Sequence, residues 1–208
     1  MSFKNNQFDD LLFGRRSIRS FDPQIKISKD EMLTMIDEAA KAPSSVNMQP
    51  WRLVIVESPE AKLKPLIRFN TLQNETSSAM ILIFGDMRSQ ERAEEIYGKA
   101  VKENKMPEAV KQEQLAKIVP TYDNASREEM SHIVHIDASL LAMQLMLVAR
   151  AHGYDTNAIG GFEKDQLAQA FDLDPERYVP VVIVAMGVAK DKGYDSVRLD
   201  AKDITKFY

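Results

Sequence analysis

The sequence predicts an α+β fold in which helices cover both faces of a central β-sheet. Three segments are short and almost continuously apolar: WRLVIVE (51–57), AMILIFGD (79–86) and PVVIVAMGVA (180–189). Runs with so few alternating polar residues are typical of strands that are buried on both faces. The stretches between them contain apolar residues that recur at helical spacing.

The first part of the chain is predicted to contain two helices before the first strand. Residues 6–13 are expected to form a short helix that ends at a glycine. A second helix is expected from about 29 to 41, because Ser28 and Glu31 match a capping box and apolar residues follow at helical spacing. Pro43 ends this helix, since a proline pushes the residue before it out of helical geometry.

The second half of the chain is predicted to be mostly helical. Residues 88–118 are rich in lysine and glutamate, and their two weak helical patterns, split at a proline, are expected on the outside of the molecule. A long helix runs from the Ser126 cap to about Ala151, and its second half, ASLLAMQLMLVA, is apolar nearly all round. Such a helix is buried on every side, in a core or in a subunit interface. A last helix (164–171) precedes the third strand, and an irregular tail closes the chain.

Composition favours one globular domain and excludes several classes of protein. A chain of 208 residues without repeats or a linker is expected to form a single domain, 1–208. The net charge of −4 argues against a general nucleic-acid binder, and the absence of cysteine excludes disulfides and thiolate catalysis. No signal-peptide core is present, and no apolar run approaches the roughly 20 residues that span a bilayer. A cytoplasmic protein that does not enter a membrane is therefore expected.

A basic run, RRSIRSF, places Arg15, Arg16 and Arg19 within five residues, with Ser17 among them. One interpretation is a solvated surface patch, which is the more frequent origin of a basic run. The other is a site for one phosphate, because guanidinium groups bind phosphate oxygens in pairs and a serine hydroxyl adds a donor. In an acidic protein such a cluster attracts a small anion rather than a nucleic acid. Composition alone leaves both interpretations open.

Two further segments have a simple and a functional interpretation. PSSVNMQPW, which begins at Pro43, consists of residues that are common in turns. Its neutral donors and acceptors are also those that surround the edge of a flat heteroaromatic ligand. NAIGGF (157–162) carries paired glycines, which form a bend or let backbone N–H groups approach a ligand. It lacks the GxGxxG spacing of a dinucleotide site.

A metal site is not expected in this chain. His132 and His135 lie three residues apart on one predicted helix, a spacing that can bind a metal ion. No carboxylate or third histidine stands at a recognisable ligand spacing, so both histidines are interpreted as structural.

Taken in order, these segments resemble the FMN-dependent nitroreductase family. The resemblance spans nearly the whole chain, with 85–125 the least diagnostic part. The matching motifs are RRSIRSF, APSSVNMQPWRLVIV, FNTLQNETSSAMILIF, IDASLLAMQLMLVARAHGY followed by NAIGGF, PVVIVAMGVA, and VRL near the C-terminus. The resemblance implies a nitroreductase-like FMN fold with a mixed central sheet in a three-layer α/β/α sandwich. It also implies an intertwined homodimer, with the helix 126–151 at the dimer core.

The resemblance implies that residues from both ends of the chain hold the phosphate side of FMN. Four side chains would reach FMN from one subunit: Arg15, Arg16, Ser17 and Arg19. Arg15 and Ser17 would face the phosphate and ribityl end, whereas Arg19 would lie near the pyrimidine side of the ring. Arg198 would be a second phosphate ligand. Some family members have a lysine two residues before this arginine, where this chain has Ser196.

Other residues are implied to surround the flavin ring and the ribityl chain. Four would come from the partner subunit: Pro43, Ser44, Ser45 and Asn47. Asn70 and Gln73 would contact the ribityl chain and the flavin edge. Gly160 and Gly161 would offer backbone N–H groups to flavin N5 and O4. Some members have an acidic residue where this chain has Gly160, so the local charge differs here.

The activity implied by the resemblance is that of an NAD(P)H-dependent FMN oxidoreductase. NADPH or NADH would reduce the flavin at N5, and a nitroaromatic or quinone acceptor would then be reduced on the same face in a ping-pong cycle. No protein acid or base is expected to be required. One alternative is a flavin-binding redox sensor or FMN reservoir with little turnover, and another is a specialised flavin reaction such as reductive dehalogenation. Residues 88–125 are the candidate cover of the substrate pocket.

Overall fold

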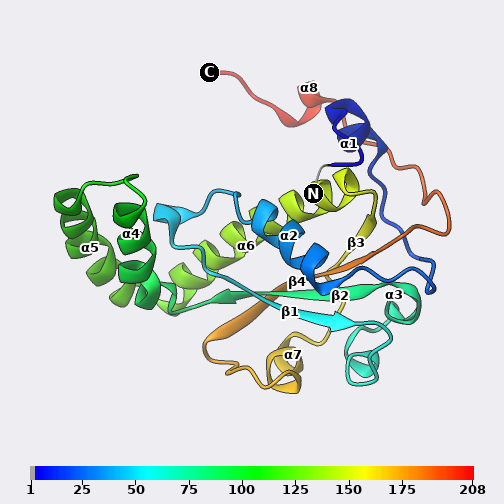
Figure 1. Ribbon diagram of the computed structural model, residues 1–208, viewed down its shortest axis with the longest axis horizontal. Coiled ribbons are helices and arrows are strands. Elements are labelled where there is room, and N and C mark those ends of the chain that lie inside the picture. The colour runs from blue at the N-terminus through cyan, green and yellow to red at the C-terminus, as the bar shows by residue number, and fades with distance from the viewer. Residues whose placement is uncertain (1–2) are drawn as a thin grey trace.

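Four antiparallel strands form the centre of the computed structural model, which describes residues 3–208 (Figure 1). They are β1 (Trp51–Glu57), β2 (Ala79–Asp86), β3 (Asp155–Ile159) and β4 (Tyr178–Gly187). Their order across the sheet is β1-β2-β4-β3. A parallel bridge between Ser17 and Thr156 extends the pairing beyond β3, so the sheet is mixed at this edge. The predicted bounds of the first two strands are confirmed, and β4 begins two residues before the predicted position.

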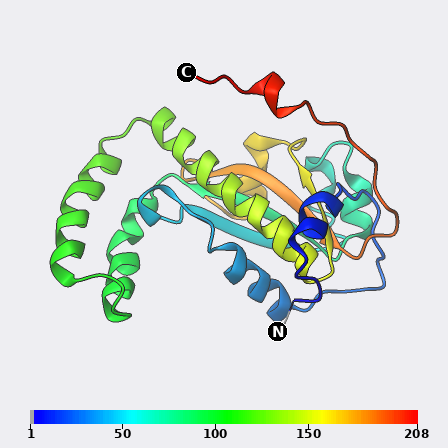
Figure 2. The ribbon, with the colours of Figure 1, turned by 90° about the horizontal axis from the view of Figure 1, so that it is seen from above.

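Helices cover both faces of this sheet, as its apolar strands predict. On one face, α2 (Lys29–Ala39) and α6 (Arg127–Ala151) pack against β1, β2 and β4 around the largest apolar cluster (Figure 2). On the other face, α3 (Thr71–Thr76) and α7 (Lys164–Ala170) border a second cluster. β2 is buried along its whole length because it lies between two strands and two helical layers. The predicted three-layer arrangement is confirmed.

Helix α6 is the longest element, and its ends are defined by the residues that the sequence indicates. The capping box between Ser126 and Glu129 is present, and Gly153 follows the helix with a φ of +86°. The apolar second half is not buried on every side in one chain, because Leu140 and Met143 are exposed, as is Ile136 just before it. By length and composition α6 could cross a membrane, yet its other face packs on the sheet of this fold.

A helical hairpin of α4 (Ala93–Lys102) and α5 (Glu108–Asp123) stands at one end of the sheet (Figure 1). Pro107 caps α5, as predicted from the split between the two helical patterns. α5 continues past the predicted end at 118 and contains Pro120. The hairpin packs on the start of α6 around a third apolar cluster, which includes Met48, Tyr97, Ile118, Tyr122 and Val134.

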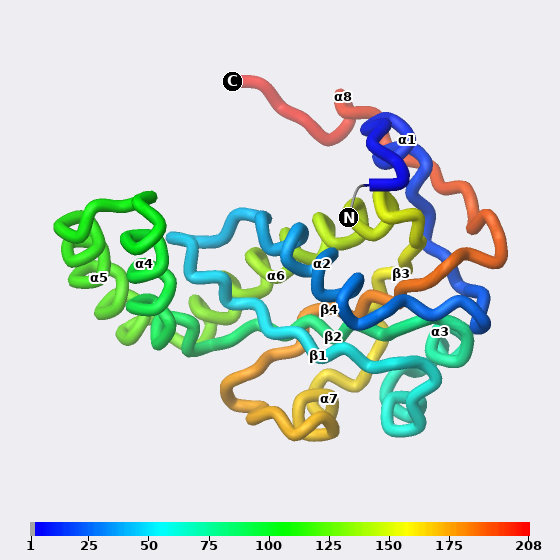
Figure 3. Tube along the Cα trace, viewed as in Figure 1, coloured from blue at the N-terminus to red at the C-terminus, as the bar shows by residue number. Residues whose placement is uncertain are grey.

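The first helix and the C-terminal tail lie on the outside of the body. α1 (Phe8–Gly14) begins two residues later than predicted, and the C-terminal tail contains a short helix, α8 (Ala201–Ile204), which was not expected. The tail runs away from the sheet to a free C-terminus (Figure 3). Its apolar side chains stay exposed, and Phe207 keeps 90% of its accessible surface.

Candidate functional site

A cleft of about 500 Å³, here named the β3 cleft, lies where the N-terminal segment meets β3 and α3. It brings together six residues that the family resemblance assigns to one site: Ser17, Arg19, Asn70, Gln73, Gly160 and Gly161. The remaining lining residues are Phe69, Leu72, Asn157, Ala158 and Ile159. These residues come from three separate parts of the chain, so the fold, and not a local motif, brings them together.

The N-terminal wall of the cleft is built like a strand. The backbone N–H of Ile18 donates to the carbonyl of Thr156 at 3.1 Å, next to the parallel bridge at Ser17. Ile18 is buried in the apolar cluster below. Because side chains alternate along extended backbone, Ser17 and Arg19 point the other way, into the cleft.

The opposite wall is formed by the glycine turn after β3 and by two amide side chains. Asn70 Nδ2 donates to the carbonyl of Gly161 at 3.3 Å, and Gln73 Nε2 donates to Asn70 Oδ1 at 3.3 Å. A Cβ atom built on Gly160 would meet no atom within 4 Å. Backbone next to Gly160 is therefore open to a ligand, while the amides hold the turn in place.

An arginine cluster lies beside the cleft, and its positive charge is only partly compensated. Burial, followed by the charges of Arg198, Arg16 and Arg150, lowers the pKa of Arg15. Arg16 pairs with Asp195 at 3.3 Å, and Arg150 pairs with Asp155 at 2.9 Å. Arg15 has no carboxylate partner within residues 3–208.

This cluster is suited to an anion. Arg198 is exposed, and its guanidinium donates to Ser196 Oγ at 2.9 Å and to its neighbouring carbonyl. A dianion placed between Arg15 and Arg198 would relieve the repulsion that lowers the pKa of Arg15. The β3 cleft and this cluster together offer a phosphate-sized anion site next to a polar slot for a flat ligand.

Residues 43–49 of the segment PSSVNMQPW, here named the polar loop, lie elsewhere in the same chain. Ser45 is held against Asp137 in the middle of α6, while the β3 cleft is built on residues that follow the end of this helix. Asp137 and Ala151 are separated by about 21 Å at 1.5 Å per residue of helix. The loop residues that the resemblance assigns to the partner's flavin are all exposed or partly exposed in this chain: Pro43, Ser44, Ser45 and Asn47. One chain does not bring them to the β3 cleft.

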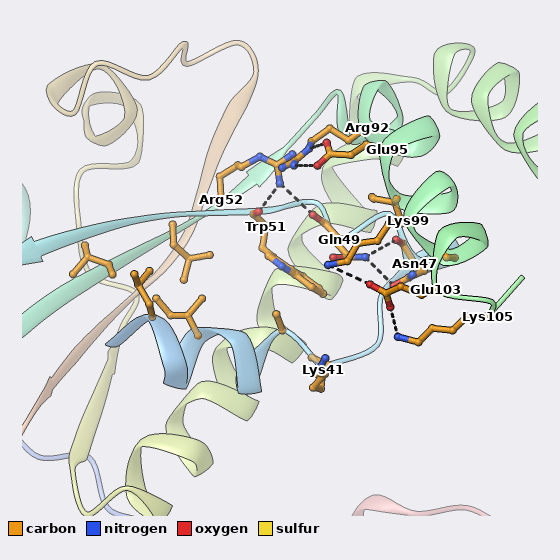
Figure 4. Close-up of a pocket in the computed structure, with 18 residues that line it drawn as sticks. Lys41, Asn47, Gln49, Trp51, Arg52, Arg92, Glu95, Lys99, Glu103 and Lys105 are labelled. Carbon is orange, nitrogen blue, oxygen red and sulfur yellow. Dashed lines mark hydrogen bonds and ion pairs between the residues drawn. The ribbon is translucent and has the colours of Figure 1, made fainter. Parts of the chain in front are cut away.

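A larger groove, of about 850 Å³, was not indicated by any motif in the sequence (Figure 4). It lies between α2, β1 and α4, and Leu53 and Ile55 of β1 are among its apolar lining residues. Its rim carries more cations than anions: Lys41, Arg52, Arg92, Lys99 and Lys105 against Glu95 and Glu103. The sequence could not reveal this groove, because its rim residues lie far apart along the chain. Taken one at a time, each is an ordinary charged surface residue. Asn47 and Gln49 line one end, so the groove adjoins the polar loop.

Of the two histidines considered as metal ligands, His135 takes part in a local contact. His135 Nδ1 lies 2.7 Å from the carbonyl oxygen of Ser131, one turn earlier, and His132 is exposed. Across residues 3–208 no group of three or more His, Cys, Asp or Glu side chains is placed to hold a metal ion.

Comparisons with known proteins agree on one family. The model of the Nitroreductase family matches residues 12–188. YdgI of Bacillus subtilis, which is named as an NAD(P)H nitroreductase, is 48% identical and covers 98% of this chain and 99% of its own length. The CLA biosynthesis enone reductase of Lactiplantibacillus plantarum is 40% identical, over 98% of this chain and 95% of its own. A solved structure from Exiguobacterium sibiricum, named as a nitroreductase in complex with FMN, is 48% identical, covers 100% of both chains and has a TM-score of 0.96.

Proposed function

The chain belongs to the nitroreductase family, and from this premise we propose that it is an NAD(P)H-dependent FMN oxidoreductase. The observation that carries the proposal is the β3 cleft, which joins Ser17, Arg19, Asn70 and the two glycines beside an undercompensated arginine cluster. The donor set fits FMN in kind, with cations for a phosphate, neutral amides and hydroxyls for a polyol, and open backbone for a flat ring.

Each group of residues has a distinct task in this proposal. Arg15 and Arg198 hold the phosphate, and Arg16 adds positive charge from the side that it shares with Ile18. Ser17 and the amides of Asn70 and Gln73 hold the ribityl chain. Arg19 would lie near the part of the flavin ring where negative charge develops when the flavin is reduced. Its guanidinium would therefore favour the reduced flavin. The Gly160–Gly161 backbone orients the ring and leaves one face free. When bound, FMN supplies the chemistry, accepting hydride from NADPH or NADH at N5 and delivering it to a nitroaromatic or quinone acceptor in ping-pong order.

The site is proposed to be completed by a second copy of the chain. The polar loop is separated from the β3 cleft of its own subunit by much of the length of α6, so it reaches a flavin only across an interface. The surface offers apolar residues for such an interface on α6 and on the tail: Ile136, Leu140, Met143, Val197, Leu199, Ile204 and Phe207. We therefore propose an intertwined homodimer with FMN sites at the subunit interface.

Three further assignments complete the proposal. Residues 1–208 form a single FMN-binding domain in this proposal, and 88–125 form part of the wall that selects the acceptor. The cytoplasm is the proposed compartment because NAD(P)H is the electron donor. The acceptor class is proposed to extend to enones, since a relative of 40% identity is named as an enone reductase.

The test is an anaerobic absorption spectrum of the purified, FMN-loaded protein before and after addition of NADPH, and separately of NADH. Flavin bands that bleach, and return when a nitroaromatic, a quinone or an α,β-unsaturated ketone is added, support the oxidoreductase. The acceptor that restores the bands fastest ranks the three classes. Bands that persist with both donors favour a sensor or reservoir. A protein that takes up no FMN refutes the proposal.

A further inference from the structure

The backbone of the polar loop is held in an unfavourable conformation. Val46, Asn47 and Gln49 have φ values of 44°, 56° and 47°, in the left-handed region. This region is uncommon for residues other than glycine, and for a β-branched residue such as Val46 it is a genuine outlier. Such strain persists only where surrounding contacts overdetermine the backbone, and it concentrates at ligand-contacting segments.

Two buried side chains from different elements supply these contacts. Asp137 of α6 accepts the N–H of Ser45 with both carboxylate oxygens, at 3.1 and 3.0 Å, and it is only 2% exposed. Tyr97 of α4 donates its hydroxyl to the carbonyl of Val46 at 2.8 Å. The N–H of Ser45 and the carbonyl of the next residue, Val46, are thus both fixed by buried side chains. The buried side chain of Met48 also anchors the loop.

Apart from the buried Met48, the central residues of the loop turn their backbone inward and stay exposed. Ser45, Val46 and Asn47 are exposed while the groups that hold them are buried. Asp137 itself is costly to bury, because burial raises the pKa of its carboxyl and the Ser45 N–H offsets only part of this effect. An apolar residue at position 137 would serve packing better, so the carboxylate is explained by what it does to the loop.

We infer that Asp137 and Tyr97 are positioning residues that hold the loop 43–49 in the conformation in which it contacts FMN bound to the partner subunit. This inference rests on the proposed function. A loop that is preorganised in this way does not lose backbone entropy when the ligand binds. It also gives the α4–α5 hairpin a second role, because Tyr97 connects the hairpin to the flavin site in addition to any cover it forms over the acceptor.

The first test compares Asp137→Ala, Asp137→Asn and Tyr97→Phe as apoproteins titrated with FMN, using quenching of flavin fluorescence. Loss of a hydrogen bond that fixes the loop should weaken FMN binding by about tenfold in Asp137→Ala and by less in Tyr97→Phe. Asp137→Asn keeps one acceptor oxygen and should recover much of the affinity. The midpoint potential of the bound flavin should shift in the same order.

Two matched controls separate positioning from general stability. Tyr154→Phe removes a buried hydroxyl that bonds Glu31 at the other end of α6, and Glu128→Gln neutralises an exposed carboxylate on the same helix. Both should bind FMN like the parent protein. If Tyr154→Phe lowers the melting temperature as much as Asp137→Ala and weakens FMN binding equally, Asp137 acts through stability alone and the inference is wrong.

Mixed dimers test whether the loop acts across the interface. In a dimer of one Arg15→Ala chain and one Asp137→Ala chain, a loop that acts on the partner leaves one site with both parts intact. FMN binding should therefore be restored by mixing two defective proteins. If the loop acts within its own chain, both sites remain defective and mixing restores nothing, which overturns the inference. A parent protein that binds no FMN would instead remove the proposed function itself.

Discussion

Arg177 donates two hydrogen bonds to the fully buried carboxylate of Asp86, from Nε to Oδ1 at 2.9 Å and from Nη2 to Oδ2 at 3.1 Å. Arg52 approaches the same carboxylate, with Nη2 at 3.0 Å from Oδ2. These contacts join the end of β2 to the start of β1 and to the segment before β4. They also fix one wall of the groove beside the polar loop.

Replacing Asp86 by alanine should destabilise the fold strongly. Arg52 would lose its anionic partner in a partly buried position, and Arg177 would keep only its contact with Glu91. Breaking such a buried pair costs about 3 kcal/mol or more. Urea denaturation followed by circular dichroism measures the change in the free energy of unfolding. Asp37→Ala, at an exposed position of α2, should change it by less than about 0.5 kcal/mol. A loss for Asp86→Ala no larger than that of the control would show that the buried ion pairs contribute little.

The arginine cluster gives a prediction about FMN affinity. Arg15→Ala and Arg198→Ala should each weaken FMN binding by about tenfold, because each removes a charge-assisted hydrogen bond to phosphate. Arg127→Ala removes an exposed cation that pairs with Glu176, far along α6, and serves as the control. Isothermal titration of the apoproteins with FMN, and with riboflavin, measures the effect. The losses should vanish with riboflavin, which lacks the phosphate, and unchanged FMN occupancy in both variants would remove the phosphate assignment.

The local patterns of the sequence were sufficient for most of the secondary structure. The bounds of β1 and β2 and the capping box of Ser126 follow from a few neighbouring residues, and the structure reproduces them. The Ser28 box is only half present, since Ser28 accepts from Glu31 while the Glu31 carboxylate accepts from Tyr154. The partner of the Glu31 carboxylate is thus a residue 123 positions away, and a local sequence pattern cannot include it.

The candidate site was predictable only in part, for the same reason. Ser17, Asn70 and Gly160 were assigned to one site through the family resemblance, and the fold brings them together. Asp137 was not singled out, because a lone aspartate in an apolar helix carries no motif. Its role becomes visible only when the loop 43–49 is seen to fold back on α6.

Tyr154 predicts a change in stability at alkaline pH. Burial, the hydrogen bond to Glu31 and the charge of Glu31 raise the pKa of Tyr154 to about 12, from an ordinary value of 10.0. The unfolded chain therefore releases this proton first, so the stabilisation is complete below about pH 10 and is lost as the pH rises toward 12. Tyr154→Phe should cost about 1 kcal/mol at neutral pH and less at pH values above 10.

Urea denaturation of both proteins at neutral pH and at about pH 11 measures this difference in the free energy of unfolding. Tyr208→Phe, which removes an exposed hydroxyl, controls for the substitution. A cost of Tyr154→Phe that is the same at both pH values would show that the hydroxyl does not titrate differently in the two states.

Gly160 gives a prediction that separates binding from folding. A Cβ atom at this position meets nothing within 4 Å, and its backbone does not require the left-handed region, so Gly160→Ala should leave the stability of the apoprotein within about 0.5 kcal/mol. The added methyl group would project into the β3 cleft, where the backbone N–H is proposed to contact the flavin. FMN binding should weaken by about tenfold, or the reduction of bound flavin by NADPH should slow, in stopped-flow absorbance.

Gly98→Ala provides the matched control, because a Cβ atom on this residue of α4 would also be unhindered, with Nζ of Lys111 on α5 at 3.9 Å. An alanine in a helix should raise stability by about 0.5–1 kcal/mol and leave FMN binding unchanged. If Gly160→Ala instead unfolds the apoprotein, the turn contributes to packing. If Gly160→Ala binds and reduces FMN like the parent, the flavin edge does not lie against this turn, and the orientation proposed for the ring in the cleft is wrong.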